Sequence, residues 1–582
     1  MEEIFMKRIL KTIICGVLML ALTFSVSTPV IAQEESEYPL ATAESMGSSG
    51  ISPITGTFIQ PWLYASWNET RWDQEIEEWK MLGIEYLIMG DTLSVSPNNN
   101  YTITASYPTN IEEVTRSTDY LTMLFRKCKQ YGIKLYIGIG NTDNGWDFLD
   151  LEVSASVEKF KKLSTIFAAV AEDIYNIYYE DYKDIFAGFY FVPELYNNSA
   201  FSTAEGRSTY SEGLAAGLDI IFDKLNSLNK DLPFIFSPYV NLFGGSWVCK
   251  DTEQIGMFWQ EALATAGFRD GDILCPQDSV GAGGNDLANL DAMTKAYRNA
   301  VDNCGKDIKL YSNCEIFVQP NSEYISRNDE GVNYWETATI DRMIKQFDIV
   351  SQYVDKLFVF AYPHYLSSYL SANGFYNTYI HYLETGELDT MPPIAPNTFS
   401  TSKRNANGKE ALYINWGGMY DNYGISRVNI YKDGKFYGYR IAERGNAKSN
   451  TINLYPTKFY DTGYNFNTDK NVTYEFEVID CSGNVSERSS LIVEPGSVPN
   501  NIKLTNIYKG PVENYGDESS HSASSEEDSS EPVSNSDEST GEKIGLSQGV
   551  KIALVAGLLA VICIAVFFIP NKNNIKKTND KK

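Results

Sequence analysis

Short apolar runs recur along the first two thirds of the chain at intervals typical of strands that alternate with helices. Trp72, Ile76 and Trp79 recur at helical spacing, and Thr70 with Asp73 gives this segment a start that resembles a capping box. Eight runs have the length and composition of buried parallel strands: Thr57–Gln60, Tyr86–Met89, Lys134–Ile139, Gly188–Val192, Phe234–Ser237, Asp272–Cys275, Lys309–Asn313 and Leu357–Ala361.

Helices are predicted between these runs. The apolar positions within 121–128 indicate a helix that should end at Gly132, because glycine favours the position after a helix. A later helix is predicted from Ile340 to Val354. Strands that alternate with helices indicate an α/β fold with a parallel sheet. Eight units of about 40 residues match one (β/α)8 TIM barrel, which we place at residues 51–388.

Two glutamates directly follow predicted strands. Glu194 comes after the fourth strand, which closes with Tyr190–Val192, and Glu315 comes after the seventh, which closes with Leu310–Asn313. Active sites of such barrels are built at the carboxyl ends of the strands. A carboxyl pair at this end predicts acid/base chemistry on a sugar.

Several predicted strand-to-helix connections are long and carry aromatic residues. Examples are Asp91–Arg116, which contains Tyr107, and Val240–Thr252, which contains Trp247. Flat aromatic rings offer rigid, amphipathic contact area to sugars. The alternative is that these rings only pack the loops onto the barrel.

The two ends of the chain predict its location. Lysine and arginine precede the apolar stretch Ile13–Phe24, so residues 1–32 are predicted to be a secretory signal peptide. Ile552–Ile569 is an apolar run of 18 residues, near the lower limit for a membrane span, and the tail 570–582 after it is rich in lysine. We therefore expect a single-pass type I membrane protein at the cell surface, with its barrel outside the cell.

The segment before the predicted span is acidic. Glu513–Glu542 contains ten Asp and Glu residues, many serines and no Lys or Arg, within a chain of net charge −27. This composition predicts a disordered stalk over residues 510–547. The acidic balance argues against a nucleic-acid partner, because nucleic-acid binding needs basic surfaces.

A second domain is predicted at residues 394–496, as a small all-β sandwich. Its expected strands are Ala411–Trp416, Gly424–Lys432, Asn450–Leu454, Val472–Asp480 and Arg488–Val493. The segment Tyr474–Asp480, followed by Gly483-Asn484-Val485-Ser486, resembles the last strand pair of fibronectin type III modules. Such modules are commonly spacers in bacterial carbohydrate enzymes, and direct glycan binding is the alternative.

Cysteine and histidine offer little catalytic chemistry. The cysteines are scattered without a C-x-x-C pair, so they indicate neither a disulfide framework nor a zinc site, and we expect no metal and no cofactor. Cys314 lies beside Glu315, but no histidine is expected on a neighbouring strand end, so a packing thiol is favoured. His364, just after the eighth strand, is either functional or a hydrogen-bonded structural residue.

Three motifs carry a family resemblance: Gly56-Thr57-Phe58-Ile59-Gln60-Pro61, Val192-Pro193-Glu194, and Cys275-Pro276-Gln277-Asp278-Ser279-Val280-Gly281. With the glutamates after strands four and seven, they make residues 51–385 resemble a bacterial family of glycosidase-like TIM barrels of unknown function (DUF4434-like), related to clan A glycoside hydrolases. The chain departs from that clan at Pro193, where an asparagine is usual.

The resemblance implies that Glu194 is the general acid/base and Glu315 the nucleophile of a retaining hydrolase. The apolar residues around Glu194 should raise its pKa, whereas Glu315 should stay ionised with help from Asn313 or Tyr239. Asp278 is a competitor, as an inverting base or a ligand for substrate hydroxyls. Their positions at or near strand ends predict the substrate-binding residues Gln60, Trp62, Asp91, Asn141, Tyr239, Gln277, Asp278 and Tyr362.

Together these observations predict a membrane-anchored extracellular glycoside hydrolase that acts on a polysaccharide or oligosaccharide. One alternative is a non-catalytic glycan-binding or adhesion protein on the same scaffold, since one fold can host many functions. A third is an enzyme that remodels the producing cell's own wall.

Overall fold

The computed structural model describes residues 53–90, 92–143, 149–319, 336–369, 373–406, 408–441, 457–498 and 503–505. The predicted signal peptide, stalk, span and lysine-rich tail lie outside the described residues, as does the predicted strand Asn450–Leu454. None of the helices in the described part is both long and apolar enough to cross a membrane.

Eight parallel strands form a closed barrel, as the sequence predicted. Around the barrel the order is β1, β14, β11, β10, β9, β8, β6 and β2, so strands that follow one another in the chain are neighbours. Each predicted strand coincides with one of them: Ile54–Ile59 (β1), Tyr86–Met89 (β2), Lys134–Gly138 (β6), Phe186–Phe191 (β8), Phe234–Phe236 (β9), Ile273–Leu274 (β10), Lys309–Glu315 (β11) and Lys356–Phe360 (β14).

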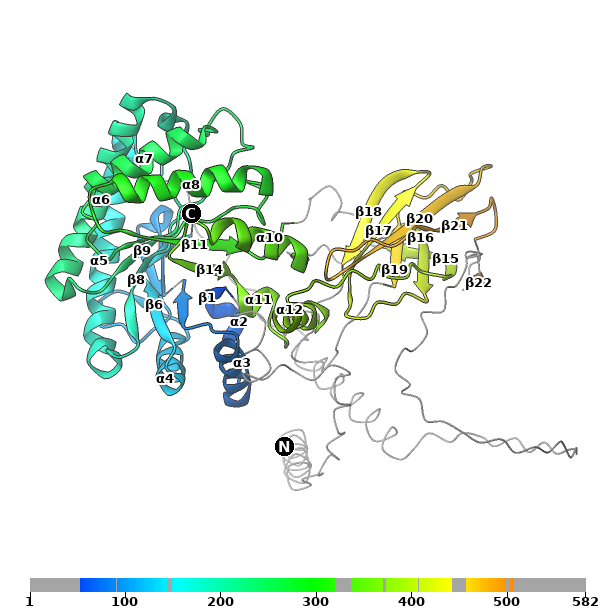
Figure 1. The fold of residues 1–582 in the computed structure, drawn as a ribbon, viewed down its shortest axis with the longest axis horizontal. Coiled ribbons are helices and arrows are strands. Elements are labelled where there is room, and N and C mark those ends of the chain that lie inside the picture. The colour runs from blue at the N-terminus through cyan, green and yellow to red at the C-terminus, as the bar shows by residue number, and fades with distance from the viewer. Residues whose placement is uncertain are drawn as a thin grey trace, which may run out of the picture. The chain divides into compact units, whose positions relative to one another are not determined.

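Helices surround the strands (Figure 1). The long ones are Glu69–Met81 (α3), Leu121–Tyr131 (α4), Ser154–Tyr182 (α5), Ala204–Asn229 (α6), Thr252–Thr265 (α7), Leu287–Asn303 (α8), Ile340–Val350 (α10) and Asn373–Thr385 (α12). Short helical turns are Pro61–Tyr64 (α2), Pro97–Asn99 (η2), Ser199–Ser202 (η3) and Tyr362–Tyr365 (α11).

Two predicted helix ends were wrong and one is confirmed. Helix α3 begins after Asn68, whose side chain accepts a hydrogen bond from the Arg71 N–H, so the cap precedes the predicted Thr70. Helix α10 ends at Val350 rather than Val354. Helix α4 ends at Gly132, whose positive φ of 75° is readily adopted by glycine.

Side chains of the strands alternate between two cores. One set packs outward against the helices, where Trp72, Trp79 and Trp259 are fully or almost fully buried. The other set fills the barrel interior with aromatic rings, among them Phe58 and Tyr190. The interior is therefore a packed core, so a ligand cavity can form only at an end of the barrel.

Two of the long loops contain strands of their own. The connection after β2 supplies Leu93–Ser96 (β3), Thr102–Ala105 (β4) and Thr115–Arg116 (β5), which form a sheet with Asn141–Thr142 (β7). After β11, Phe317–Val318 (β12) pairs with Glu336–Thr337 (β13). The sequence predicted that these connections are long, but it did not predict the strands within them.

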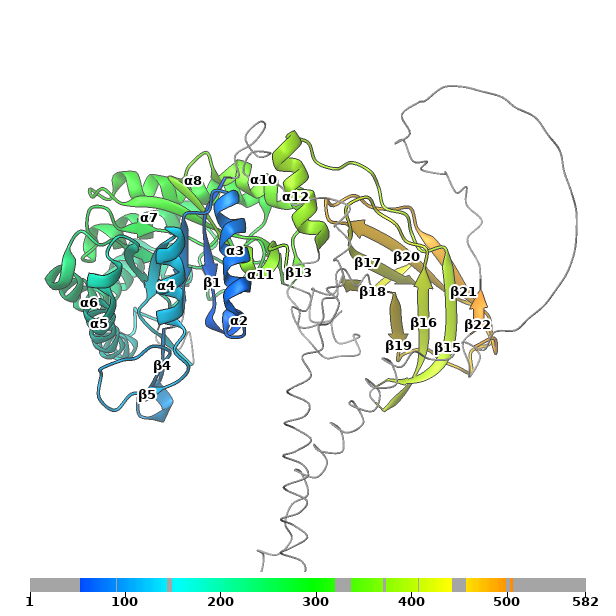
Figure 2. The same cartoon turned by 90° about the horizontal axis from the view of Figure 1, so that it is seen from below.

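The second domain contains two four-stranded sheets that share one apolar core (Figure 2). Rings from both sheets meet in this core, with the centroids of Phe399 and Phe476 4.9 Å apart. One sheet has Thr398–Ala406 (β15), Lys409–Gly417 (β16), Lys458–Asp461 (β19) and Lys503–Thr505 (β22); the other has Ile425–Lys432 (β17), Lys435–Ile441 (β18), Val472–Asp480 (β20) and Ser489–Val493 (β21). The expectation of an all-β domain is confirmed. The sequence did not predict β15, β18, β19 and β22. The resemblance to fibronectin type III modules stays a prediction.

Candidate active site

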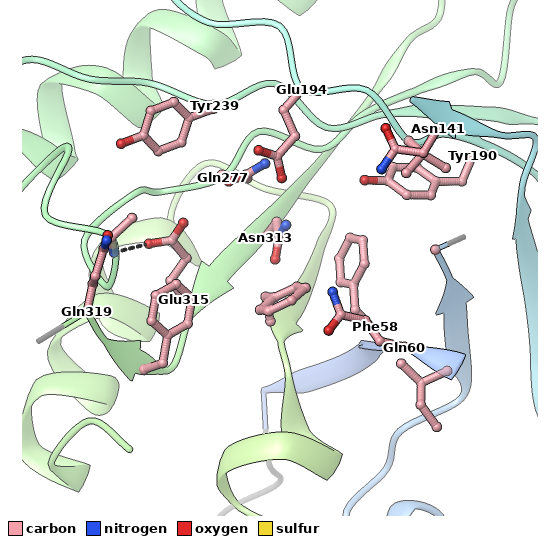
Figure 3. A pocket seen from close by; sticks show the side chains of 16 residues that line it. Phe58, Gln60, Asn141, Tyr190, Glu194, Tyr239, Gln277, Asn313, Glu315 and Gln319 are labelled. Atoms are coloured by element: carbon pink, nitrogen blue, oxygen red, sulfur yellow. Dashed lines mark hydrogen bonds between the residues drawn. The ribbon is translucent and has the colours of Figure 1, made fainter. Parts of the chain in front are cut away.

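The two predicted catalytic glutamates lie at the same end of the barrel. Glu315 is the last residue of β11, and Glu194 follows the end of β8 by three residues. Both line a cavity of about 440 Å³. Figure 3 shows their carboxyl groups on different sides of this cavity, directed toward its interior.

Four of the predicted substrate-binding residues also line the cavity. The complete lining consists of Phe58, Ile59, Gln60, Gly90, Asn141, Tyr190, Val192, Glu194, Tyr239, Gln277, Ala282, Asn313, Glu315, Phe317, Gln319 and Phe360. Gln60, Asn141, Tyr239 and Gln277 come from four different strand ends, and they surround the two glutamates with polar groups (Figure 3). The lining thus combines a few polar groups with aromatic walls, as is usual for small-molecule sites.

Asp278 and Tyr362 are not among the lining residues. Asp278 is buried behind Glu315, where its Oδ1 accepts the Glu315 backbone N–H at 3.1 Å and its Oδ2 accepts a hydrogen bond from Gln346. The Tyr362 hydroxyl is fully buried and donates to Glu78. The sequence predicted that both side chains contact a substrate, but neither of them reaches the cavity.

Two further predicted residues cannot be placed in the cavity. Asp91 lies outside the described residues. Trp62 belongs to α2, but its side chain is outside the described part of the structure.

Glu315 is held in a strongly perturbing environment. Its side chain is 3% exposed, and the Ala282 N–H donates to its Oε2 at 2.6 Å. Burial, then the negative charges of Asp278 and Glu194, raise its pKa well above the usual value, while the Ala282 N–H and Arg342 act in the opposite direction.

The predicted surroundings of the two glutamates are therefore corrected. The sequence predicted apolar surroundings at Glu194 and an ionised Glu315, yet Glu194 is only half-buried and Glu315 is the buried carboxyl. Burial also raises the pKa of Asp278. Because Asp278 and Glu315 are adjacent, ionisation of one opposes ionisation of the other.

Helix α10 supports Glu315 from behind. Arg342 is half-buried, and its Nη2 donates to the backbone oxygens of Glu315 at 3.0 Å and Phe317 at 2.7 Å. Gln346, one helical turn further on, donates to Asp278 and to the Glu315 backbone oxygen. These contacts hold the backbone at the end of β11, which carries Glu315.

The loop after β10 completes the setting of Glu315. Asp278 Oδ1 accepts the Val280 N–H at 3.2 Å, which turns the chain so that Ala282 faces Glu315. Gly281 fits only because it lacks a side chain, since an added Cβ would lie 2.5 Å from the Phe317 oxygen and 2.8 Å from the Glu315 Cβ. This motif was singled out in the sequence, but its role as a support for Glu315 was not predicted.

Tyr239 lines the same cavity as the two glutamates (Figure 3). Its backbone N–H donates to the Leu195 oxygen at 2.8 Å, which joins the loops after β9 and β8. Burial, followed by the charges of Glu315 and Glu194, raises the pKa of Tyr239 to about 12. The phenol therefore stays protonated near neutral pH and remains a hydrogen-bond donor.

Asn313 lines the cavity as well, but it does not support Glu315 in the expected way. Its Nδ2 donates to Ser237 Oγ at 3.3 Å. Its buried Oδ1 accepts no hydrogen bond within the described part of the chain. A buried amide oxygen at a cavity wall is suited to accept a hydrogen bond from a ligand hydroxyl.

Sequence reasoning missed the aromatic walls of the cavity. Phe58 packs against Phe360 with centroids 5.7 Å apart, and against the edge of Tyr190 at 5.6 Å. All three lie near strand ends, and the alternation of inward and outward positions was the signal available for them. Gln319 was also missed, because the short strand β12 that carries the chain past the cavity gives no clear pattern.

The aromatic loop residues divide into two groups. Tyr107 is 1% exposed, so in its case the packing alternative holds. Trp247 is 50% exposed and packs edge-on against Tyr196, and Phe243 nearby in the same loop is 53% exposed. Because this loop follows β9, these two rings lie at the strand-end side of the barrel.

Cys314 and His364 do not join the lining residues. Cys314 is buried, and burial raises the pKa of its thiol well above the usual value, which disfavours the reactive thiolate. His364 is buried against Phe360 and Tyr365. A packing role, the favoured prediction for Cys314, agrees with these surroundings.

The closed barrel of eight parallel strands, with helices around it, defines a (β/α)8 TIM-barrel protein. The chain belongs to the family described as "Domain of unknown function (DUF4434)", whose model matches residues 54–371. No curated protein matches the chain.

Solved structures with some likeness include three carbohydrate enzymes. Chitinase ChiA74 from Bacillus thuringiensis shares 12% identity over 76% of this chain and 84% of its own, with a TM-score of 0.31. A GH5-4 broad-specificity endoglucanase from Clostridium acetobutylicum shares 12% identity over 55% of this chain and 88% of its own, with a TM-score of 0.31. The intracellular xylanase TsXylA from Thermoanaerobacterium saccharolyticum shares 9% identity over 56% of this chain and 89% of its own, with a TM-score of 0.33. Because all three TM-scores are low, the fold assignment rests on strand order and on the family match.

Proposed function

We propose that the barrel is a glycoside hydrolase that cleaves a polysaccharide or oligosaccharide with Glu194 and Glu315. The observation that carries the proposal is that these carboxyl groups, from strand ends far apart in sequence, line one cavity and are directed into it. Glycosidic bonds break through an oxocarbenium-like transition state, which needs a proton on the leaving oxygen and negative charge near the anomeric carbon. Two opposed carboxyl groups supply both.

We assign the nucleophile to Glu315 and the acid/base to Glu194, with retention of configuration. In the first step Glu315 forms an ester bond to the anomeric carbon, while Glu194 donates its proton to the departing glycosidic oxygen. In the second step Glu194 takes a proton from water, the water oxygen bonds to the anomeric carbon, and the Glu315 carboxylate leaves. The half-exposed position of Glu194 suits contact with water, and the fixed position of Glu315 suits attack at one atom.

The remaining lining residues are proposed to bind the sugar. Gln60, Asn141 and Gln277 offer amides, and Tyr239 offers a protonated hydroxyl. Phe58 and Phe360 offer flat apolar surface for the C–H face of a sugar ring. Asp278 is assigned to the support of Glu315 rather than to the substrate.

The chain ends support a proposed location at the cell surface. A signal peptide over residues 1–32 and a membrane helix at Ile552–Ile569 would leave the barrel outside the cell on an acidic stalk. Mild protease treatment of intact cells tests this proposal, because it should release the barrel only if the barrel is outside.

A non-catalytic glycan-binding protein is the second candidate. It is favoured by Pro193, which stands where clan A enzymes carry an asparagine, and by the raised pKa of Glu315, which opposes the charge that a nucleophile needs. Such a protein would bind sugars in the same cavity without cleaving them.

A panel of polysaccharides, assayed with the full-length chain for both cleavage and binding, separates the two candidates. With a substrate in hand, Glu315→Ala should abolish turnover. Glu194→Ala should slow natural glycosides about 10²- to 10⁴-fold but spare aryl glycosides with good leaving groups. Azide should rescue Glu194→Ala with retained configuration and Glu315→Ala with inverted configuration.

Glu77→Ala is the control for these variants, because Glu77 is exposed on α3 and is not among the residues that line the cavity. It should keep full activity. Full activity of both cavity variants would exclude the pair, and sugar binding without any cleavage would support the glycan-binding candidate instead.

A further inference from the structure

Three carboxylates gather at one end of the β-sandwich, outside the barrel cavity. Asp389 lies in the linker between α12 and β15, Asp421 in the connection between β16 and β17, and Asp480 at the end of β20. One carboxylate oxygen from each lies within 4.8 Å of the other two. Elsewhere in the described residues, no other group of three His, Cys, Asp or Glu side chains is close enough to hold a metal ion.

The cluster contains buried oxygens that lack a donor. Asp421 is only 9% exposed, yet its Oδ2 accepts no hydrogen bond within the described residues, and the same is true of the buried Asp389 Oδ2. Asn422 adds a third such oxygen, its Oδ1, and its Nδ2 donates to Asp389 Oδ1 at 3.1 Å. Buried polar atoms are rarely left without a partner, so these oxygens indicate a missing ligand.

The other oxygens of the cluster are already bound, and this holds the carboxylates in place. Asp421 Oδ1 accepts the backbone N–H groups of Tyr423 at 2.9 Å and Gly424 at 2.7 Å. Asp480 Oδ1 accepts those of Gly483 at 2.7 Å and Asn484 at 2.8 Å. Asn484 Nδ2 also bridges Asp480 Oδ2 and the Asp389 backbone oxygen, at 2.8 and 2.9 Å.

No positive side chain neutralises the cluster within the described part of the chain. None of the ion pairs found there involves Asp389, Asp421 or Asp480. Buried carboxylates without a cation are costly, because each has lost its water and repels the others. A bound metal cation would remove both costs.

We propose that Asp389, Asp421 and Asp480 bind a calcium ion, with Asn422 Oδ1 as an additional ligand, and that this ion fastens the linker to two loops of the sandwich. The clustered ligand atoms are all oxygens, which suit a hard cation better than zinc, whose sites are built mainly from cysteine and histidine. Calcium accepts irregular sets of six to eight oxygens, whereas magnesium demands near-ideal octahedral geometry. The site is independent of the glycosidase proposal, because none of its residues lines the cavity.

Calcium titration of the full-length chain, after removal of metal with a chelator, tests the proposal. Equilibrium dialysis with calcium alone, up to millimolar concentration, should show one more bound ion in the wild type than in Asp421→Asn or Asp389→Asn. Asp469→Asn is the matched control, because Asp469 is an exposed carboxylate of the same domain. Calcium held by the acidic segment Glu513–Glu542 would be the same in the wild type and in every variant. Equal total calcium binding by the wild type and both cluster variants would therefore overturn the proposal.

Protease protection gives a second readout that does not count ions. Glu387 is exposed and precedes Asp389 by two residues, so a glutamate-specific protease can cut within the linker. Calcium should slow this cut at least tenfold in wild type and Asp469→Asn, but not in Asp389→Asn. Equal protection by magnesium would refute the assignment to calcium, and no protection in wild type would refute the fastening role. If Asp421→Asn fails to fold, Asp389→Asn still tests the proposal in both measurements, because Asp389 is only half-buried and its substitution should perturb folding less.

Discussion

The chemistry of Glu315 depends on three neighbours that are distant from it in sequence. Asp278 places a second buried carboxyl beside it, while the Ala282 N–H and the Arg342 guanidinium favour its charged form. A nucleophile must be ionised, and a carboxyl with a raised pKa reaches that state only at higher pH. The acid limb of a pH–rate profile should therefore report Glu315, and the influence of Asp278 on it can be measured.

Asp278→Asn should move the acid limb to lower pH. Removing the neighbouring negative charge lowers the pKa of Glu315, so Glu315 ionises earlier as the pH rises, by about one unit. The measurement is kcat/KM against pH on a confirmed substrate, with Asp286→Asn as the control, because Asp286 caps α8 and does not line the cavity. A shift of the alkaline limb would instead make Glu315 the proton donor, and no shift of either limb would mean that Asp278 does not set this pKa.

At the scale of elements, the loop after β10 holds Glu315 through close contact at Gly281. Gly281→Ala should lower kcat about tenfold or more with little change in KM, because the new methyl group must displace Glu315 or the Phe317 backbone. Gly438→Ala in β18 is the control, since nothing lies within 4 Å of its added Cβ. Unchanged kcat in Gly281→Ala would show that this loop does not position Glu315.

The exposed rings after β9 give a second prediction at this scale. Trp247→Ala should raise KM for long substrates about two- to tenfold and leave kcat on a short aryl glycoside unchanged, because a lost stacking contact is worth about 0.5–1.5 kcal/mol. The melting temperature should change little, since half of the side chain is exposed. Tyr420→Ala is the control and should leave KM unchanged, because Tyr420 is a similarly exposed ring of the sandwich. Equal KM values for Trp247→Ala and wild type would show that this loop does not contact the substrate.

The sequence predicted the positions of the barrel strands better than the contacts of individual site residues. Buried parallel strands are apolar runs that can be recognised locally, so all eight barrel strands and the strand-end positions of Glu194 and Glu315 were found. The burial of Asp278 and Tyr362 was missed because it depends on Gln346 and Glu78, which belong to helices distant in the chain. The strands β3 and β4 were missed because each has only four residues, which is too short for an alternating pattern to stand out in the sequence.

For the whole molecule, the composition predicts where the chain is most easily cut. The acidic, Ser-rich composition of Glu513–Glu542 predicts a segment with too little apolar surface to form a core, so we expect limited digestion with a broad-specificity protease to cut there before it cuts the barrel or the sandwich. The expected product is a soluble fragment that contains both domains and keeps all activity or sugar binding of the full chain. Mass spectrometry of the early products locates the cuts, and the cavity variant Glu315→Ala should give the same pattern as wild type. Early cuts within residues 54–371 would instead mean that the barrel does not behave as one cooperative unit, in conflict with its closed eight-stranded sheet.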